Sequence, residues 1–415
     1  MKKKAESSAP PRRADLVPYV LAVGGIVLAW QIIIQPFVQR APAEIAIRIA
    51  PGSPLVLRRA AEAELAATRN SNAAALGRDA LRRSPFDVRA LRVVGMTEAR
   101  AGRLEQADEL LTLAGNWSLR DDPAHAWLVE QRLRQGDYSS AFAHADTLAR
   151  RRADIQPQIF DLFTTAAAAD PQRVLPVLTG LVAAEPPWRS AYLTSLYTTN
   201  EGLQVSASLA VMLQSSRAPL TTPELQQFYL QMVEKGQFPI LTAIRARLNR
   251  PAVGPAVANG EFDDPTSPEP FQWSLAQQVG AVAEVLSDDA DPSNSALRVE
   301  YDGYSTANLA FQRVFLAPGR YRLRARSRTE SGEPTDRMAW SISCDPSGQS
   351  LLSASAVDAT NASSRAWAPS AMEFSVPQGC ENQWLVLRGR PMDFRSPMVA
   401  WFDQVSITPV HSTPN

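Results

Sequence analysis

The sequence predicts a multidomain α and β protein, in which one N-terminal transmembrane helix precedes an α-helical solenoid and a C-terminal all-β sandwich. Three observations predict this order: an uncharged apolar stretch near the N-terminus, a 34-residue period in the part that follows, and a series of short apolar runs toward the C-terminus. At 415 residues the chain exceeds what one hydrophobic core usually serves, so more than one folded domain is expected.

The composition is typical of globular proteins, since 45% of the residues are hydrophobic and 20% are charged. The 42 basic and 42 acidic residues balance, so the formal net charge is zero. Binding to phosphates requires a basic excess. The balance therefore argues against nucleic acid as a partner.

The N-terminal segment consists of a basic leader, residues 1–15, and an apolar stretch of 23 residues without formal charge, 16–38. That length is enough for a helix to cross a hydrocarbon core of about 30 Å. The positive-inside rule places the basic leader in the cytoplasm. The sequence therefore predicts a single pass through a bacterial inner membrane, with the bulk of the protein in the periplasm. A cleavable signal peptide is the alternative, because Ala41-Pro42-Ala43 offers a small-x-small site.

Residues 43–250 are rich in alanine, leucine and arginine, which favours helices. The pattern at Gly102 recurs 34 residues later at Gly136: a glycine, a polar residue, a bulky apolar residue and then, five positions after the glycine, an alanine. Gly202 and Gly236 are again 34 residues apart. We expect the glycines to end helices in left-handed turns and the alanines to let the next helix pack closely.

This period resembles that of tetratricopeptide repeats. The resemblance implies a right-handed superhelix whose concave surface binds a peptide or protein partner. The alternative is that the array only spaces and rigidifies the C-terminal domain. His125 and His144 lie here on different helices, and we expect them to be packed or solvated, not catalytic.

The character of the sequence changes at residues 251–258, a predicted linker in which proline and glycine interrupt the helices. Residues 259–410 then contain short apolar runs bounded by turn residues, which indicate strands. Seven or more strands in about 150 residues predict an all-β sandwich. The runs are 296–301, 310–316, 321–326, 338–342, 372–376, 384–387 and 398–407.

Several segments of this domain resemble carbohydrate-binding modules of the galactose-binding-like jelly-roll type, namely 259–262, 271–273, 297–299, 315–323 and 401–407. The resemblance covers the whole domain and implies contact with a polysaccharide, although this sandwich also serves as a structural or protein-binding module. In similar modules an acidic residue of the opening segment and the aspartate of the closing strand often hold a structural calcium. Glu261 and Asp403 are the matching positions, and oxygen ligands suit that ion. The alternative is that both are ordinary turn and strand-end carboxylates.

Tryptophan and arginine supply the candidate sugar contacts. Trp367 lies in a polar stretch and is the tryptophan expected to stack on a sugar ring, whereas Trp273, Trp384 and Trp401 lie within apolar strand patterns and are expected in the core. Five arginines alternate with other residues from 320 to 328, so they share one face of a strand. Such a row would bind acidic sugars through bidentate contacts if it were unpaired; the alternative is a solvated face offset by neighbouring acids. The central members of the row are Arg322, Arg324 and Arg326.

The chain has two cysteines, Cys344 and Cys380, and neither belongs to a metal-like cluster. In an exported domain they are expected to form one disulfide.

The sequence contains no HExxH or GxSxG motif and only three histidines, so we assign no catalytic residue. We expect a non-enzymatic accessory protein of envelope or extracellular polysaccharide production, whose repeats recruit a protein partner and whose sandwich contacts glycan. The architecture resembles membrane-anchored repeat proteins of bacterial exopolysaccharide systems. A purely protein-binding scaffold of an envelope complex is the alternative. No cofactor is expected apart from the calcium.

Overall fold

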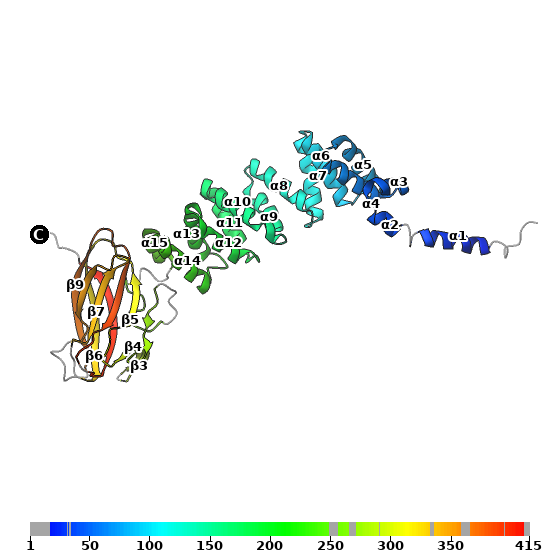
Figure 1. Ribbon diagram of the computed structural model, residues 1–415. Coiled ribbons are helices and arrows are strands. Elements are labelled where there is room, and N and C mark those ends of the chain that lie inside the picture. The colour runs from blue at the N-terminus through cyan, green and yellow to red at the C-terminus, as the bar shows by residue number, and fades with distance from the viewer. Residues whose placement is uncertain are drawn as a thin grey trace, which may run out of the picture. The chain divides into compact units, whose positions relative to one another are not determined.

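The computed structural model describes most of the chain, and two predicted segments, the leader 1–15 and residues 251–255 of the linker, lie outside it. The chain divides into two compact units, Met1–Ile159 and Phe160–Asn415, which we describe separately. Figure 1 shows that helices come first along the chain and strands follow. The described residues are 17–30, 32, 35–248, 256–264, 271–289, 291–332, 336–357, 366–393 and 395–410.

The first unit is helical. Its consecutive helices pack in pairs, α4 with α5, α6 with α7 and α8 with α9. Its helices are α1 (Val17–Ala29), α2 (Gln35–Arg40), α3 (Ala43–Ile49), α4 (Pro54–Ala66), α5 (Asn70–Arg83), α6 (Val88–Arg100), α7 (Leu104–Trp117), α8 (Asp122–Arg134) and α9 (Tyr138–Ala149), and the short η3 (Ala153–Ile155) leads into α10 (Gln156–Ala169).

Three helices end at a glycine with positive φ, as the sequence predicts: Gly102, Gly136 and Gly236. After each glycine, the next backbone N–H donates to the carbonyl five residues earlier, at 3.0, 2.9 and 2.8 Å, which satisfies carbonyls that the helix end would leave unpaired. Gly202 differs, because it lies in the first turn of α13, where a Cβ would stand 2.2 Å from the Leu196 carbonyl oxygen. That glycine permits a close backbone approach and does not end a helix.

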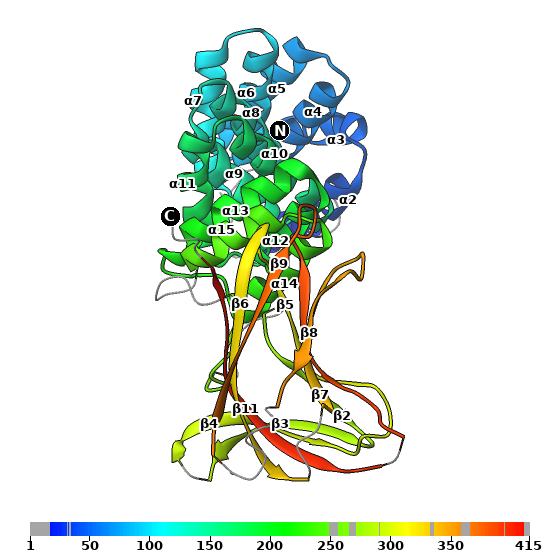
Figure 2. The ribbon, with the colours of Figure 1, turned by 90° about the vertical axis from the view of Figure 1, so that its left-hand side faces the viewer.

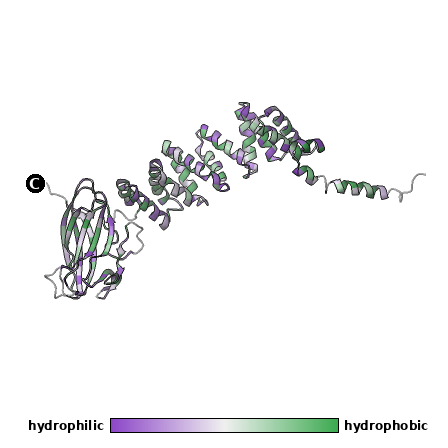
Figure 3. Cartoon of the chain, viewed as in Figure 1, coloured by the Kyte–Doolittle hydropathy of each residue, from purple (hydrophilic) through white to green (hydrophobic). Residues whose placement is uncertain are grey.

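The predicted membrane span is not supported by the helices of the described residues. No helix within the described ranges is both long and apolar enough to cross a membrane. Helix α1 is apolar along its length (Figure 3), but it has 13 residues and is therefore about 20 Å long, shorter than a hydrocarbon core of about 30 Å. The prediction of a single-pass inner-membrane protein anchored by residues 16–38 is therefore wrong: it rested on the number of consecutive uncharged residues, whereas α1, which lies in that stretch, is too short to cross.

The second unit begins with helices and ends with strands. Its helices are α11 (Pro171–Val182), α12 (Arg189–Ser195), η4 (Leu196–Thr198), α13 (Asn200–Gln214), α14 (Thr222–Glu234) and α15 (Phe238–Leu248). The helical end and the start of the strand region share one hydrophobic cluster. Within it the buried ring of Phe271 meets Tyr229 edge to face at 4.8 Å, and the Arg245 guanidinium lies 4.1 Å from the Phe271 ring centre.

The strands form two sheets, which Figure 2 shows as the layers of a sandwich. Five strands in the order β1-β5-β10-β7-β8 form sheet A, and six in the order β2-β3-β4-β11-β6-β9 form sheet B. Inward side chains such as Trp340, Leu385, Leu323 and Phe402 fill the core. The strands are β1 (Ser274–Leu275), β2 (Gln277–Gln278), β3 (Ala281–Asp288), β4 (Asp291–Tyr301), β5 (Ala307–Val314), β6 (Gly319–Ser331), β7 (Met338–Cys344), β8 (Ser350–Ser355), β9 (Ala368–Val376), β10 (Gln383–Gly389) and β11 (Met398–Pro409).

The opening segment of the sandwich docks on the closing strand. The Val405 N–H of β11 donates to the Gly260 carbonyl at 2.9 Å. A Cβ at position 260 would stand 1.9 Å from the Val405 carbonyl oxygen, so only glycine fits there. This contact brings the segment that contains Glu261 beside the strand that contains Asp403.

Candidate functional site

The arginine row lies on the outward side of β6, as its period predicts. Leu323, Ala325 and Ser327 are buried, while the arginines between them are exposed or half-buried. We call the outward side of sheet B around this row the arginine face. Both neighbours of β6, β11 and β9, pair with it antiparallel, so their outward side chains flank the arginines.

Most arginines of this face are paired with acids. Arg322 and Arg320 both donate to Glu373 of β9, at 2.5 and 3.1 Å, and Arg322 above all holds the pKa of Glu373 below its ordinary value. Arg328 pairs with Asp288 at 2.9 Å. Arg326 pairs with Asp403 of β11. Arg324 is exposed, and its guanidinium has no partner in the described part of the chain.

Trp367 is held within the same face. Its indole N–H donates to Asp288 at 2.9 Å, and the guanidinium carbons of Arg326 and Arg328 lie 4.7 and 5.4 Å from its ring centre. The structure therefore brings the predicted tryptophan together with Arg326, although Arg322 pairs elsewhere. These contacts leave Trp367 half-buried and its N–H engaged.

Trp401 also points outward on sheet B, contrary to the expectation that it is a core residue. Its N–H donates to Glu330 at 2.7 Å, and Arg328 lies 4.6 Å from its ring centre. Hydrogen bonds from Arg298, with a further one from Trp401, hold the pKa of Glu330 below its ordinary value. Trp401 is buried because these charged side chains cover it.

The opposite side of the sandwich presents a different surface, which we call the sheet A face. On the central strand β10, Trp384 and Arg388 point outward, while Leu385 and Leu387 point into the core. Arg313 of β5 lies opposite Trp384, with its guanidinium carbon 4.2 Å from the centre of the Trp384 ring. Phe311, two positions earlier on β5, has its ring centre 5.7 Å from that of Trp384. Trp384 is half-buried in this arrangement, so the expectation that it is a core residue was wrong.

Small polar side chains continue the sheet A face. In the strand register, Ser343 lies opposite Trp384, and Ser341 lies opposite Val386 and next to Ser353. Arg388 is exposed, and its guanidinium has no partner in the described ranges. Arg313, by contrast, donates to Asp345 at 2.6 Å.

This face was missed because the apolar run 384–387 was taken as wholly buried. Its period-two pattern carried the signal: Leu385 and Leu387 alternate with Trp384, Val386 and the charged Arg388. Because Arg388 is charged and has the same parity as Trp384 and Val386, these three side chains are expected to point away from the core.

The residues expected to hold calcium do not fit that ion. Both oxygens of Asp403 accept hydrogen bonds, Oδ2 from Arg326 and from the Asn294 amide at 3.1 Å, and Oδ1 from the Gln404 N–H at 2.7 Å. Partial loss of water around the Glu261 carboxylate, followed by the nearby charge of Asp403, raises the pKa of Glu261. No group of three or more histidine, cysteine, aspartate or glutamate side chains in the described parts is arranged to hold a metal.

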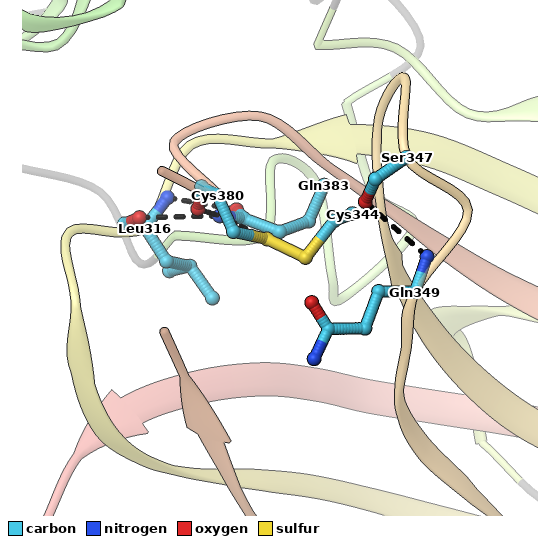
Figure 4. The surroundings of a disulfide bond; sticks show 6 residues. All are labelled: Leu316, Cys344, Ser347, Gln349, Cys380 and Gln383. Carbon is cyan, nitrogen blue, oxygen red and sulfur yellow. Dashed lines mark hydrogen bonds between the residues drawn. A yellow bond between two sulfur atoms is a disulfide. The ribbon is translucent and has the colours of Figure 1, made fainter. Parts of the chain in front are cut away.

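Cys344 and Cys380 form the predicted disulfide, with Cα atoms 5.4 Å apart (Figure 4). Cys344 ends β7, and Cys380 lies in the turn that precedes β10. The side-chain amide of Gln383 donates to the carbonyl oxygens of Leu316 and Cys380 beside the bond. The disulfide thus ties this turn to the end of sheet A.

Comparisons with known proteins give partial likenesses only. No family model matches the chain, and no curated protein matches it. Similar solved structures include CBM4, with 16% identity and a TM-score of 0.28, covering 37% of this chain and 99% of that one. A second is CBM61 in complex with β-1,4-galactotriose, with 14% identity and a TM-score of 0.27, covering 38% and 100%. A third is a family 16 carbohydrate-binding module, with 17% identity and a TM-score of 0.26, covering 37% and 99%. Likenesses at this level assign no ligand to this chain.

Proposed function

We propose that the protein recognises a glycan through the sheet A face and has no catalytic role of its own. The observation that carries this proposal is the half-buried Trp384, which lies beside Phe311 on a face bordered by serines and by the exposed Arg388. An aromatic ring covers the apolar C–H side of a sugar, while hydroxyl and guanidinium groups bond to its hydroxyls. Both kinds of group are present on this face within neighbouring strands.

The arginine face is the weaker candidate for the same role. Glu373, Asp288 and Asp403 already neutralise most of its arginines, and the Trp367 N–H is engaged. A glycan binding there would have to displace charge-assisted hydrogen bonds, which are stronger than neutral ones. On the sheet A face, a glycan could bind to Arg388 without displacing a hydrogen bond from that guanidinium to any residue in the described ranges.

The test compares two tryptophan variants of the full chain on a panel of immobilised polysaccharides. The full chain is needed because the helical end and the sandwich share buried contacts at Phe271. Trp384→Ala should lose binding, and Trp367→Ala, the matched tryptophan on the arginine face, should retain it. Loss in Trp367→Ala with retention in Trp384→Ala would contradict the proposal. Circular dichroism must show that both variants are folded.

We also propose that the helices form tetratricopeptide-like repeats that bind a protein partner. The supporting observation is an exposed aromatic pair in the first unit: Phe86, which is 79% exposed, and Trp117, with ring centres 5.5 Å apart. Leu119, in the loop after Trp117, is also exposed. Exposed apolar groups that gather in this way are typical of protein contact sites.

A photo-crosslinking amino acid at position 86 tests this second proposal. It should yield one defined crosslinked protein from cells, whereas the same probe at Arg82, an exposed site on α5, should not. Identical products from both positions, or none from position 86, would contradict it. If the partner is found but no polysaccharide binds, the protein is a purely protein-binding scaffold.

A further inference from the structure

We infer that the guanidinium of Arg326 takes the place of a structural calcium between the opening segment and the closing strand, so that the sandwich folds without that ion. The inference starts from Asp403, whose side chain has no exposed surface. A fully buried carboxylate is tolerated only when a cation or a set of donors compensates its charge. The question is which group compensates Asp403.

Arg326 supplies this compensation. Its Nε and Nη2 both donate to Asp403 Oδ2, with Nε at 3.1 Å. The Asn294 amide donates to the same oxygen, and the Gln404 N–H donates to Oδ1. Calcium binds oxygens whose lone pairs point at the ion. Here three N–H donors point at Oδ2, two of them from Arg326, so an ion bound to that oxygen would have to displace the guanidinium.

The strand register builds the pair into the sheet. Asp403 lies directly opposite Arg326, and both side chains are on the outward side of sheet B. Gln404 then takes a left-handed conformation, with φ of 53°, and the register with β6 shifts after Asp403. The strand continues into the Val405 contact with Gly260. The pair therefore lies where an ion would have joined the closing strand to the opening segment.

Trp367 supports the guanidinium from outside the strand pair. Its ring centre lies 4.7 Å from the Arg326 guanidinium carbon, a distance at which a ring attracts a cation. This contact explains why the tryptophan lies on the arginine face beside Arg326. It also restricts the freedom of the guanidinium, so the side chain can stay on Asp403.

The first experiment measures the thermal unfolding of the full chain by tryptophan fluorescence, with excess calcium chloride and with EDTA. The melting temperature should be the same in both, and calorimetric titration with calcium should show no stoichiometric binding. A higher melting temperature in calcium, or stoichiometric binding, would overturn the inference.

The second experiment removes the guanidinium. Arg326→Gln should lower the melting temperature, because Asp403 becomes a buried carboxylate without a countercharge. Calcium should then recover part of the loss, and Asp403→Asn in the same background should recover part of it without calcium. Arg322→Gln is the matched control, since Arg322 lies on the same face of the same strand but pairs with the exposed Glu373; it should melt close to the wild type.

The outcomes of the second experiment are decisive in either direction. An Arg326→Gln protein that melts like the control would contradict the inference that the guanidinium takes the place of calcium at Asp403. So would one whose melting temperature responds neither to calcium nor to Asp403→Asn. If Arg326→Gln does not fold, Arg326→Lys replaces it. Lysine keeps the charge but not the planar guanidinium that places Nε and Nη2 on Oδ2, so the melting temperature of this variant should fall and remain independent of calcium. A calcium response would again overturn the inference.

Discussion

His125 and His144 face each other through their Nδ1 atoms, which lie 3.0 Å apart between α8 and α9. The Nε2 of His125 lies 3.3 Å from the Ser118 carbonyl oxygen, which can only accept a hydrogen bond. The proton of neutral His125 is therefore on Nε2, and its Nδ1 accepts from the Nδ1–H of His144. This arrangement requires His125 to be neutral, because a proton on its Nδ1 would place two N–H donors face to face.

We expect the pair to make the first unit sensitive to acid. Burial, followed by the charge of His125, lowers the pKa of His144 to about 4, and burial lowers that of His125. An unfolded histidine titrates near 6.5. Between that pH and about 4 the unfolded chain binds protons that the folded chain does not, so stability falls as the pH falls. The other charged groups near the pair are Asp108, Asp121, Asp122, Arg132, Asp137 and Arg151.

Hydrogen exchange of α8 and α9 in the full chain at pH 7 and pH 5 measures this effect. After correction for the intrinsic pH dependence of exchange, protection should drop at pH 5 in the wild type. His144→Leu, which cannot be protonated, should show a smaller drop. Equal drops in the two proteins would assign the acid sensitivity to other groups.

Breaking the disulfide should destabilise the sandwich by about 4 kcal/mol in the chain-entropy model, given the size of the loop that it closes. The two cysteines are 36 positions apart, and both are buried. The measurement is urea unfolding of the wild type and of the double variant Cys344→Ser and Cys380→Ser. The wild type with reductant is the control and should approach the variant; an unchanged midpoint in both would show that the bond adds no stability.

Replacing Phe271 should loosen the helical end and the sandwich together. Its ring is buried between Tyr229, Arg245 and Phe315, and truncation of a buried Phe to Ala costs about 3–5 kcal/mol. Hydrogen exchange should become faster in α14 and in the first strands of the sandwich in Phe271→Ala. Phe86→Ala, at an exposed ring, is the control and should change neither region. Faster exchange in α14 alone would mean that the sandwich does not depend on this contact.

Local patterns in the sequence predicted several features correctly. The glycines at 102 and 136 end helices because a left-handed residue at a helix end is a local requirement that few other residues meet. The alternation from 320 to 328 places the arginines on one side of a strand, because the side-chain period of a strand is fixed. Both inferences use only neighbours along the chain.

Features that depend on distant partners could not be predicted in the same way. The acids that pair with Arg322 and Arg326 lie 51 and 77 positions away, on other strands. Because the fold places these acids beside β6, the two arginines form ion pairs and are not free charges. The expectation that Trp401 is a core residue failed for a related reason. Trp401 is buried, but it lies under charged side chains on the outward surface and not in the core. Hydrophobicity along one strand does not distinguish these two kinds of burial.

The last prediction separates the two faces as sites for acidic glycans. Arg388 on the sheet A face and Arg324 on the arginine face are both exposed, and neither guanidinium has a partner in the described ranges. Each could hold a sugar carboxylate through two parallel hydrogen bonds. Only Arg388 shares its face with the half-buried Trp384, so we expect only Arg388 to contribute to binding.

Arg388→Gln should therefore remove any preference of the full chain for uronic-acid polymers over neutral ones, while binding to neutral polymers remains. Arg324→Gln should keep both properties. The preference should also weaken as salt rises, because added ions screen the attraction between exposed charges and shorten the Debye length from about 8 Å at physiological ionic strength. Neither variant should melt far from the wild type, since neither arginine forms an ion pair with a residue that the structure describes. If Arg324→Gln removes the preference and Arg388→Gln does not, the carboxylate is held on the arginine face, and the sheet A face binds at most neutral sugars.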